Sequence, residues 1–322
     1  MTTVNLKTGD SILETNRETI NPDTYFVTHT PPKSLEKNEK QVNEFVSKHA
    51  AKGSKVVLIT SGGTTVPLEN QTVRFIDNFS AGTRGATSAE YPFDCLIHLI
   101  PDYAVIFMHR QFSLQPYNRH FSHQSILDLL ELKPDGSINV CSEYAHKMKA
   151  TLTKYQEYKR KEMLLMLEFF TVNDYLFLLR SVSHALNGLT HHALYYLAAA
   201  AEHKIQSGDG AMTLKMDQVP KFLKPMVTFW APQGYIVSFK LETDPHLLIP
   251  KSRQALIRYG HQIVIGNLLT TRKREVNLIT HDSEMELKLS EEEERNGVEI
   301  ESRIVNELLK RHDEWITNYS HN

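Results

Sequence analysis

An apolar run that leads into two turns of small residues constrains the fold of this chain more than any other stretch. Residues 56–59 (VVLI) have the length and composition of a strand that is buried on both faces. They lead into a turn at residues 60–65 (TSGGTT). A second small-residue segment, residues 78–85 (NFSAGTRG), precedes good helix formers and predicts a helix that begins near Gly85. We therefore expect free backbone N–H groups at a strand end and at a helix start, where phosphate binds well.

The two turns match neither of the common nucleotide-binding fingerprints. Their spacing is not that of G-x-x-x-x-G-K-[ST] or of G-x-G-x-x-G, so neither a P-loop nor an ordinary dinucleotide site is predicted. The glycines alone fit a second interpretation equally well, in which Gly62 and Gly63 only turn the chain.

Strand and helix patterns alternate along the rest of the chain. Strands are predicted at 103–108, 163–169, 193–199, 235–240 and 262–265, helices at 33–52, 122–132, 143–160, 172–186, 291–295 and 298–315, and a hairpin at 276–280 with 286–289. Ser122 is expected to start the second helix, and Asn173 or Asp174 to lie near the start of the fourth. This order predicts an α/β fold, a Rossmann-like three-layer sandwich with a mostly parallel central sheet. Residues 1–24 are expected to be a loosely ordered N-terminal arm and residues 25–322 a single α/β domain.

Several polar or small-residue motifs follow the predicted strands directly. They lie at 61–65, 198–200, 240–244 and 266–267. Ligands of open parallel sheets bind outside the carboxyl ends of the strands. The sequence therefore predicts one ligand site at that edge of the sheet.

Composition excludes several other classes of protein. The 36 basic and 38 acidic residues give no broad cationic field for nucleic acid or membrane. No run of about 18 apolar residues is present, and the N-terminus lacks the apolar core of a signal peptide. Cys95 and Cys141 form no disulfide framework, and the 16 histidines show no metal-binding spacing. We expect a cytoplasmic protein with reduced thiols and no metal held by its own side chains.

Eight short motifs together give a more specific indication. They are SGGT (61–64), RFIDNFSAG (74–82), GATSAE (85–90), YLAAA (196–200), EHKIQS (202–207), VPK (219–221), SFKLETD (238–244) and SEEE (290–293). The whole string resembles phosphopantothenate–cysteine ligase, in its eukaryotic, ATP-dependent, single-activity form. The resemblance covers most of the chain from about Tyr25 onward.

The resemblance implies a ligase of coenzyme A biosynthesis. A carboxylate does not form an amide with an amine at neutral pH unless it is first activated. In this family, 4'-phosphopantothenate attacks the α-phosphorus of ATP, and the cysteine amine then displaces AMP from the acyl-adenylate. The implied partners are phosphopantothenate, cysteine, ATP with Mg²⁺ and a second copy of the chain in a homodimer.

The resemblance also implies roles for particular residues. Lys204 would balance charge as the carboxylate attacks, and Asn78 would contact the acyl-adenylate and can reach into a neighbouring subunit's site. The nucleotide would lie against Gly62, Ser80, Gly82, Gly85, Phe239 and Asn267, and the other substrates against Ala199, Ala200, Arg74, Lys221 and Lys240. Each residue type also has an ordinary structural interpretation: turn glycines, a core aromatic for Phe239, a turn asparagine for Asn78 and a surface lysine for Lys204.

Two departures from the family pattern bear on activity. The family continues the alanines with a hydrophobic-Ser-Asp-Phe segment and a flap, whereas Ala201 here runs directly into Glu202. Residues 92–101 (PFDCLIHLIP) replace a regular connection, and their two prolines would interrupt a helix.

Three hypotheses follow. The chain is an active ligase, or an impaired member of the family that still folds, dimerises and binds nucleotide, or, less favoured, a nicotinamide- or flavin-binding protein.

Overall fold

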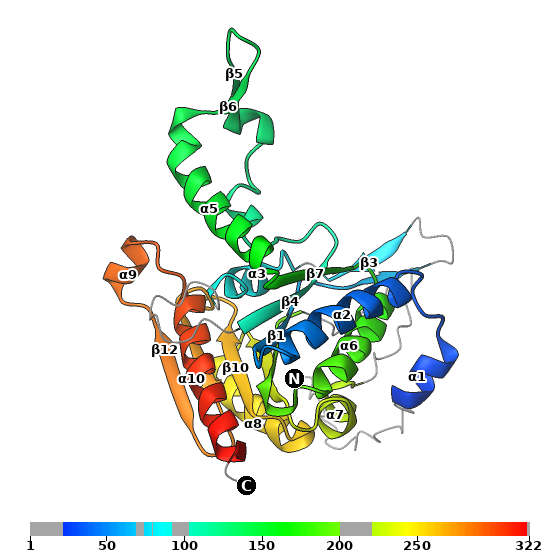
Figure 1. Ribbon diagram of the computed structural model, residues 1–322. Helices are drawn as coiled ribbons and strands as arrows, with labels where there is room; N and C mark the ends of the chain where they lie inside the picture. The colour runs from blue at the N-terminus through cyan, green and yellow to red at the C-terminus, as the bar shows by residue number, and fades with distance from the viewer. Residues whose placement is uncertain (1–21, 69–73, 79, 92–102, 200–220, 321–322) are drawn as a thin grey trace, which may run out of the picture.

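The computed structural model describes residues 22–68, 74–78, 80–91, 103–199 and 221–320, and it confirms the predicted α/β fold with a mostly parallel central sheet (Figure 1). Eight strands form one sheet in the order β12-β11-β10-β9-β8-β1-β4-β7. The strands are β1 (Lys55–Ser61), β4 (Tyr103–Arg110), β7 (Leu164–Phe169), β8 (Ala193–Leu197), β9 (Tyr235–Glu242), β10 (Ile263–Leu268), β11 (Glu275–Ile279) and β12 (Glu284–Lys288). All pair in parallel except for the antiparallel pairs β10–β11 and β11–β12.

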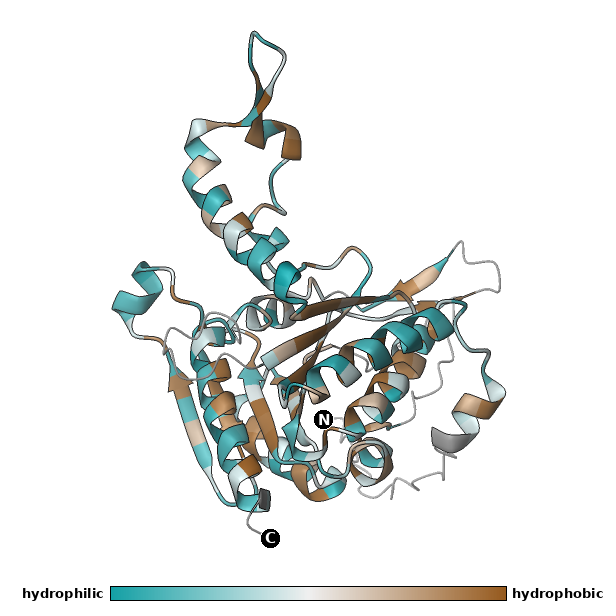
Figure 2. Ribbon diagram, in the orientation of Figure 1, coloured by the Kyte–Doolittle hydropathy of each residue, from teal (hydrophilic) through white to brown (hydrophobic). Residues whose placement is uncertain are grey.

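Alternation along β1 divides the core into two apolar layers. Val56 and Leu58 pack with helices α2 (Leu35–Ala50) and α6 (Val172–Asn187) on one face of the sheet. Val57 and Ile59 pack with α3 (Thr83–Ser88) and α10 (Ile300–Ser320) on the other. Successive strand residues point to opposite faces, so a continuous apolar run is what a strand between two helical layers requires. Figure 2 shows the apolar strands enclosed by helices whose outer surfaces are hydrophilic.

The remaining helices complete the two layers or lie at the periphery. They are α1 (Pro22–Thr28), α5 (Ser142–Lys161), α7 (Leu223–Pro225), α8 (Pro245–Tyr259) and α9 (Glu291–Arg295), with short turns η1 (Asn118–His120), η2 (Ile126–Leu129), η3 (Thr190–His192) and η4 (Met226–Trp230). The sequence did not predict α1, whose Tyr25 is buried. No helix among these described segments is both long and apolar enough to cross a membrane.

Two small hairpins stand apart from the main sheet. One pairs β2 (Thr65–Pro67) with β3 (Phe75–Asp77), and the other pairs β5 (Leu130–Leu132) with β6 (Ile138–Val140). The second hairpin, η2 and α5 form a projecting lobe, residues 126–161, that extends away from the sandwich (Figure 1). None of the residues of α5 is buried, so the outer part of this helix lies on the surface of the lobe.

Several predicted boundaries differ from those of the structure. Residues 122–132 do not form a helix begun by Ser122: Ser125 caps the short turn η2, and β5 follows. The helix expected near Gly85 begins at Thr83, because Gly82 is its N-cap with φ 78°. The strand predicted at 193–199 ends at Leu197, and β10 runs to Leu268, so that Gly266 and Asn267 lie within it.

Candidate functional site

The two turns identified in the sequence lie against one another at the carboxyl edge of the sheet. Gly62 has φ +93° and Gly82 has φ +78°, conformations that favour glycine. The Ser61 hydroxyl donates a hydrogen bond of 2.9 Å to the carbonyl of Gly82. A Cβ on Gly82 would lie 2.8 Å from Ser61 Oγ and 3.3 Å from the Gly62 nitrogen. Glycine is therefore required at position 82 by the close approach of the two turns as well as by its backbone conformation, and at position 62 by its backbone conformation and by Arg110, whose Cβ would lie 2.8 Å from an added Cβ.

Gly85 is also required by packing. It lies inside α3, where a Cβ would stand 2.5 Å from the Cβ of Ser61. Glycine at this position allows α3 to pack directly on the end of β1. Ser80 is half-buried just before the turn.

Asn78 is brought beside the first turn by the β2–β3 hairpin. Its N–H donates to the carbonyl of Thr64 at 3.1 Å, and its own carbonyl lies so close to Gly63 that a Cβ there would be 1.8 Å away. Asp77, the preceding residue, accepts from Arg110 Nη2 at 2.7 Å and from Thr65 Oγ1 at 3.1 Å. The hairpin end that carries Asn78 is therefore fixed to the ends of β1 and β4.

The end of β8 lies next to β1, and an aromatic pair joins β8 to β9. The N–H of Ala199 donates to Thr60 Oγ1 at 3.1 Å. Phe239 in β9 is half-buried and packs edge-on against Tyr196, with 4.9 Å between ring centroids. Tyr196 in turn shares a hydrogen bond of 2.7 Å with Ser88 of α3.

Lys240 lies at the same edge and is paired with Glu242. Their charged atoms are 3.3 Å apart, and Lys251 of α8 approaches the other oxygen of Glu242 to 2.9 Å. Burial alone would raise the pKa of Glu242, but the hydrogen bonds and charges of the two lysines lower it overall. The carboxylate therefore stays ionised and offsets part of the positive charge.

Asn267 is tied to α3 and α10 through an arginine that sequence reasoning missed. Arg84 donates through Nη2 to Asn267 Oδ1 at 3.1 Å and to the carbonyl of Arg272 at 2.6 Å, and through Nη1 to Glu301 Oε1 at 2.8 Å. Glu301 is only 8% exposed, and burial raises its pKa although the Arg84 charge opposes that shift. The partners of Arg84 are between 183 and 217 residues away in the chain, so no local pattern indicates them.

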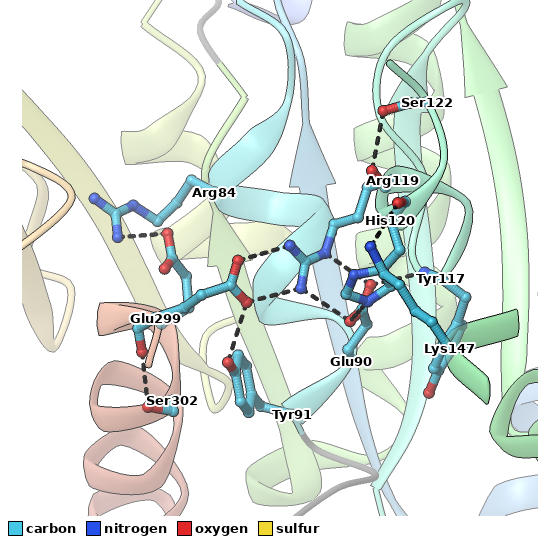
Figure 3. A network of polar contacts seen from close by, with 11 residues as sticks. Arg84, Glu90, Tyr91, Tyr117, Arg119, His120, Ser122, Lys147, Glu299 and Ser302 are labelled. Atoms are coloured by element: carbon cyan, nitrogen blue, oxygen red, sulfur yellow. Dashed lines mark hydrogen bonds and ion pairs between the residues drawn. The ribbon is translucent and has the colours of Figure 1, made fainter. Parts of the chain in front are cut away.

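A second polar network, shown in Figure 3, joins the end of α3 to the start of α10. Arg119 bridges Glu90, at 2.8 Å, and Glu299, at 2.7 Å. His120 also contacts Glu90 at 3.0 Å, and Tyr91 donates to Glu299. Burial would raise the pKa of Glu90, but hydrogen bonds from His120 and Arg119 lower it overall. No pattern in the sequence indicates this network, because a short turn, η1, supplies Arg119 and His120.

Most of the predicted site residues that the structure describes meet at this edge. The grouped residues are Gly62, Asn78, Ser80, Gly82, Gly85, Ala199, Phe239, Lys240 and Asn267. Arg74 is exposed at the other end of β3, and Lys221 is half-buried just before α7. Lys204 and Ala200, like residues 92–101 and the Ala201–Glu202 junction, lie outside the described residues.

Metal-binding side chains do not cluster within the described ranges. Across these residues, no group of three or more His, Cys, Asp or Glu side chains could hold a metal ion. A divalent cation at this edge would therefore need ligands from a nucleotide or from water.

Two similar proteins of known function have the same name. The chain is 43% identical over 336 residues to phosphopantothenate–cysteine ligase CAB2 of Saccharomyces cerevisiae, covering 92% of this chain and 87% of that protein. It is 44% identical over 290 residues to phosphopantothenate–cysteine ligase of Homo sapiens, covering 84% of this chain and 91% of the human protein. No protein-family model matches the chain.

Solved structures agree with the sequence relatives. A Cab2 mutant in complex with phosphopantothenate-cysteine superimposes with a TM-score of 0.81 at 43% identity, covering 92% of this chain and 99% of that one. A pantothenate-metabolism flavoprotein from Streptococcus pneumoniae, with a TM-score of 0.51 and 16% identity, shares the fold alone.

Proposed function

The chain belongs to the phosphopantothenate–cysteine ligase family, and from this premise we propose that it joins 4'-phosphopantothenate to cysteine through an acyl-adenylate made from ATP. The observation that carries the proposal is the contact between the turns at Gly62 and Gly82 at the carboxyl edge of the sheet. Backbone N–H groups of two adjoining turns are well suited to the phosphates of a nucleotide. The enzyme is accordingly a ligase of coenzyme A biosynthesis.

The reaction proceeds in two displacements. A carboxylate oxygen of phosphopantothenate attacks the α-phosphorus of ATP, the bond from that phosphorus to the bridging oxygen breaks, and pyrophosphate leaves. The neutral amine of cysteine then attacks the acyl carbon, loses a proton and releases AMP. Both steps require the reacting atoms to be held in line and the phosphate charge to be stabilised.

The residues at the edge of the sheet have distinct proposed roles. Gly62, Ser80, Gly82 and Gly85 form the wall against which the nucleotide phosphates lie, and Phe239 packs against the nucleotide. Asn78 contacts the acyl-adenylate from the end of the β2–β3 hairpin. Ala199 and Lys240 contact the other substrates at the same edge, and Ala200, Arg74 and Lys221 are further proposed contacts of these substrates. Lys204 supplies the mobile positive charge for the first displacement.

Mg²⁺ is proposed to enter with the nucleotide. Magnesium is commonly held by substrate phosphates and water rather than by an all-protein cage. The cation lowers the negative charge that the incoming carboxylate meets at the α-phosphorus. A chelator added to the assay should therefore stop pyrophosphate release, and excess Mg²⁺ should restore it.

The test of the proposed function is pyrophosphate release from ATP and phosphopantothenate in the absence of cysteine. The proposal expects release that requires phosphopantothenate, followed by AMP formation when cysteine is added. ATP binding without release would instead support an impaired member of the family. A retained visible absorbance spectrum typical of flavin would favour the third hypothesis.

The Ala201–Glu202 junction can be tested in the same assay. A variant with a hydrophobic-Ser-Asp-Phe segment and flap inserted after Ala201 should turn over faster than the natural chain if the shortened segment limits activity. An insert of equal length with asparagine in place of the aspartate is the matched control. Equal rates for all three proteins would show that this junction does not limit the reaction.

We further propose that the protein is a homodimer joined through the projecting lobe. Ile126, Leu127, Leu132 and Ile138 of this lobe are between 67% and 76% exposed, and Figure 2 colours η2 and part of the hairpin as hydrophobic. A two-stranded hairpin is marginally stable alone, and its free edges can pair with those of a second copy. The same apolar residues on both copies would then cover one another.

Substitution at the lobe tests this association. The double variant Leu132→Glu and Ile138→Glu should sediment as a monomer, because like charges would meet at the symmetric contact. The variant Ile257→Glu, which changes an exposed apolar residue of α8 far from the lobe in sequence, should sediment like the natural chain. A monomeric natural chain, or a lobe variant that stays dimeric, would contradict the proposed contact.

A further inference from the structure

The amide of Asn267 has an unambiguous orientation in this structure. Its oxygen accepts from the Arg84 guanidinium at 3.1 Å, and its nitrogen donates to the carbonyls of Ile265, at 3.1 Å, and Lys240, at 3.4 Å. Rotating the amide by 180° would place NH₂ against the guanidinium and an oxygen against two carbonyls. Since donors would then face donors and acceptors would face acceptors, only the observed orientation is compatible with these neighbours.

This orientation determines which hydrogen bonds Asn267 can form with a ligand. An amide has two N–H donors and two oxygen lone pairs. Both donors are engaged by backbone carbonyls, and one lone pair is engaged by Arg84. After these contacts, only the second lone pair of Oδ1 remains to accept a further hydrogen bond. Asn267 is 5% exposed, so a ligand can reach only a small part of it.

Arg84 is held firmly enough to maintain this arrangement. Its guanidinium is paired with the buried carboxylate of Glu301 at 2.8 Å and also donates to the carbonyl of Arg272 at 2.6 Å. These contacts come from α10 and from the turn after β10, so the guanidinium is fixed from two sides. A guanidinium has only hydrogen-bond donors, so it can pair with the oxygen of the Asn267 amide but not with its nitrogen.

We propose that Asn267 contacts the nucleotide only as an acceptor, from an N–H or O–H group of the nucleoside, and that Arg84 is the positioning residue that fixes this polarity. The inference rests on the proposed function and deepens it, since it says which part of the nucleotide Asn267 recognises. Ionised phosphate oxygens have no hydrogen to donate, so they cannot be its partner. The two groups with the required chemistry are an amino group on the base and a hydroxyl of the ribose.

Nucleotide analogues distinguish these two sources. With phosphopantothenate and cysteine both present, so that the enzyme turns over, KM is measured from pyrophosphate release for ATP, 2'-deoxy-ATP, 3'-deoxy-ATP and inosine triphosphate, which has a carbonyl where adenine has its amino group. Removing the donor that meets Asn267 should raise KM about tenfold, the usual effect of losing one hydrogen bond in a protein site. A penalty confined to inosine triphosphate identifies the base, and a penalty confined to one deoxynucleotide identifies that hydroxyl.

Variants test the role of Arg84 apart from its role in stability. Arg84→Met alone leaves the Glu301 carboxylate buried and unpaired, which destabilises a protein strongly. The double variant Arg84→Met with Glu301→Leu removes both charges and should regain stability in thermal unfolding. Its preference for ATP over the disfavoured analogue should nevertheless fall from about tenfold to about onefold, because the Asn267 amide is no longer held. Asn267→Ala should lose the same preference.

The control variant is Arg303→Gln, which breaks an exposed ion pair between α10 and Glu293. It should keep the stability and the analogue preference of the natural chain. The inference is overturned if the natural chain accepts all four nucleotides equally, or if the preference survives in both the double variant and Asn267→Ala. Absence of pyrophosphate release by the natural chain would overturn the ligase proposal instead. Calorimetric binding of the same four nucleotides would then still decide the role of Asn267.

Discussion

Gly82 is the residue at which backbone conformation and close packing act together. Its φ of +78° disfavours any other residue, and a Cβ would lie 2.8 Å from Ser61 Oγ. Gly82→Ala should therefore lower the free energy of unfolding by roughly 1–3 kcal/mol and weaken ATP binding, because the two turns would be forced apart. Chemical denaturation and calorimetry measure the two effects.

Gly53→Ala is the matched control for this change. Gly53 has a similar φ of +67°, but nothing lies within 4 Å of the position that its Cβ would occupy. The control should show the cost in stability without any change in ATP affinity. Equal affinities for both variants would mean that the spacing of the turns does not matter for the nucleotide.

Local features at this scale could be predicted from the sequence. The turns at Gly62 and Gly82 were predicted because small residues at a strand end and a helix start form a recognisable pattern. Arg84 follows Gly82 by two residues in the same segment, yet nothing local distinguishes it from a surface arginine. Its partners Asn267 and Glu301 are 183 and 217 residues away in the sequence. Only the order of the strands in the folded sheet brings them beside Arg84.

Helix α6 illustrates how a single cap specifies an element. Thr171 accepts from the N–H of Asp174, and the Asp174 carboxylate accepts from the N–H of Thr171 at 2.8 Å. Thr171→Ala should lower the free energy of unfolding by about 1 kcal/mol, measured in urea, because one helix N–H then loses its partner. Thr171→Ser keeps the acceptor and should match the natural chain. Equal stability of all three proteins would contradict this account of the cap.

Elements were predicted well where apolar periodicity is strong. Each predicted central strand is present, because a strand buried on both faces needs a continuous apolar run. Residues 122–132 were mispredicted because their spaced apolar residues fit a helix, whereas Ile126, Leu127 and Leu132 are exposed at the lobe. A pattern that usually indicates burial carries no such meaning where the apolar side chains face solvent.

The stability of the whole molecule should depend on pH through a buried histidine that joins its layers. His312 of α10 accepts or donates at Nδ1 with the hydroxyl of Tyr103 at 2.7 Å, and its Nε2 contacts the carbonyl of His191 at 2.8 Å. A carbonyl can only accept, so Nε2 carries the proton and Nδ1 accepts from the tyrosine. The pKa of His312 is lowered from 6.5 to about 3, mainly by burial and also by the charges of Lys55 and His192, although the hydrogen bond to the His191 carbonyl opposes the shift.

The direction of the pH effect follows from this lowered pKa. Between about pH 3 and 6.5 the unfolded chain binds a proton that the folded chain does not, so stability is full above pH 6.5 and is lost as the pH falls. This histidine contributes a slope of at most about 1.4 kcal/mol per pH unit. His312→Gln can keep both hydrogen bonds without titrating, and it should reduce the slope by that amount in urea unfolding between pH 4 and 6. An unchanged slope would show that His312 is not responsible.

The overall architecture could be predicted because it depends on the order of elements rather than on particular contacts. Alternating strands and helices favour one parallel sheet between two helical layers, and the chain has that arrangement. The projecting lobe could not be predicted, since α5 has a charged surface all round and the sequence says nothing of where such a helix points.

The root of the lobe has a mechanical consequence. Arg119 and His120 lie where the chain leaves the sandwich for the lobe, and Lys147 of α5 also donates to the His120 carbonyl at 3.0 Å. Both side chains bind Glu90, which directly follows the end of α3. The other end of α3 adjoins the turns at Gly62 and Gly82. A partner that displaced the lobe would therefore also load α3 and, through it, the two turns at the carboxyl edge of the sheet.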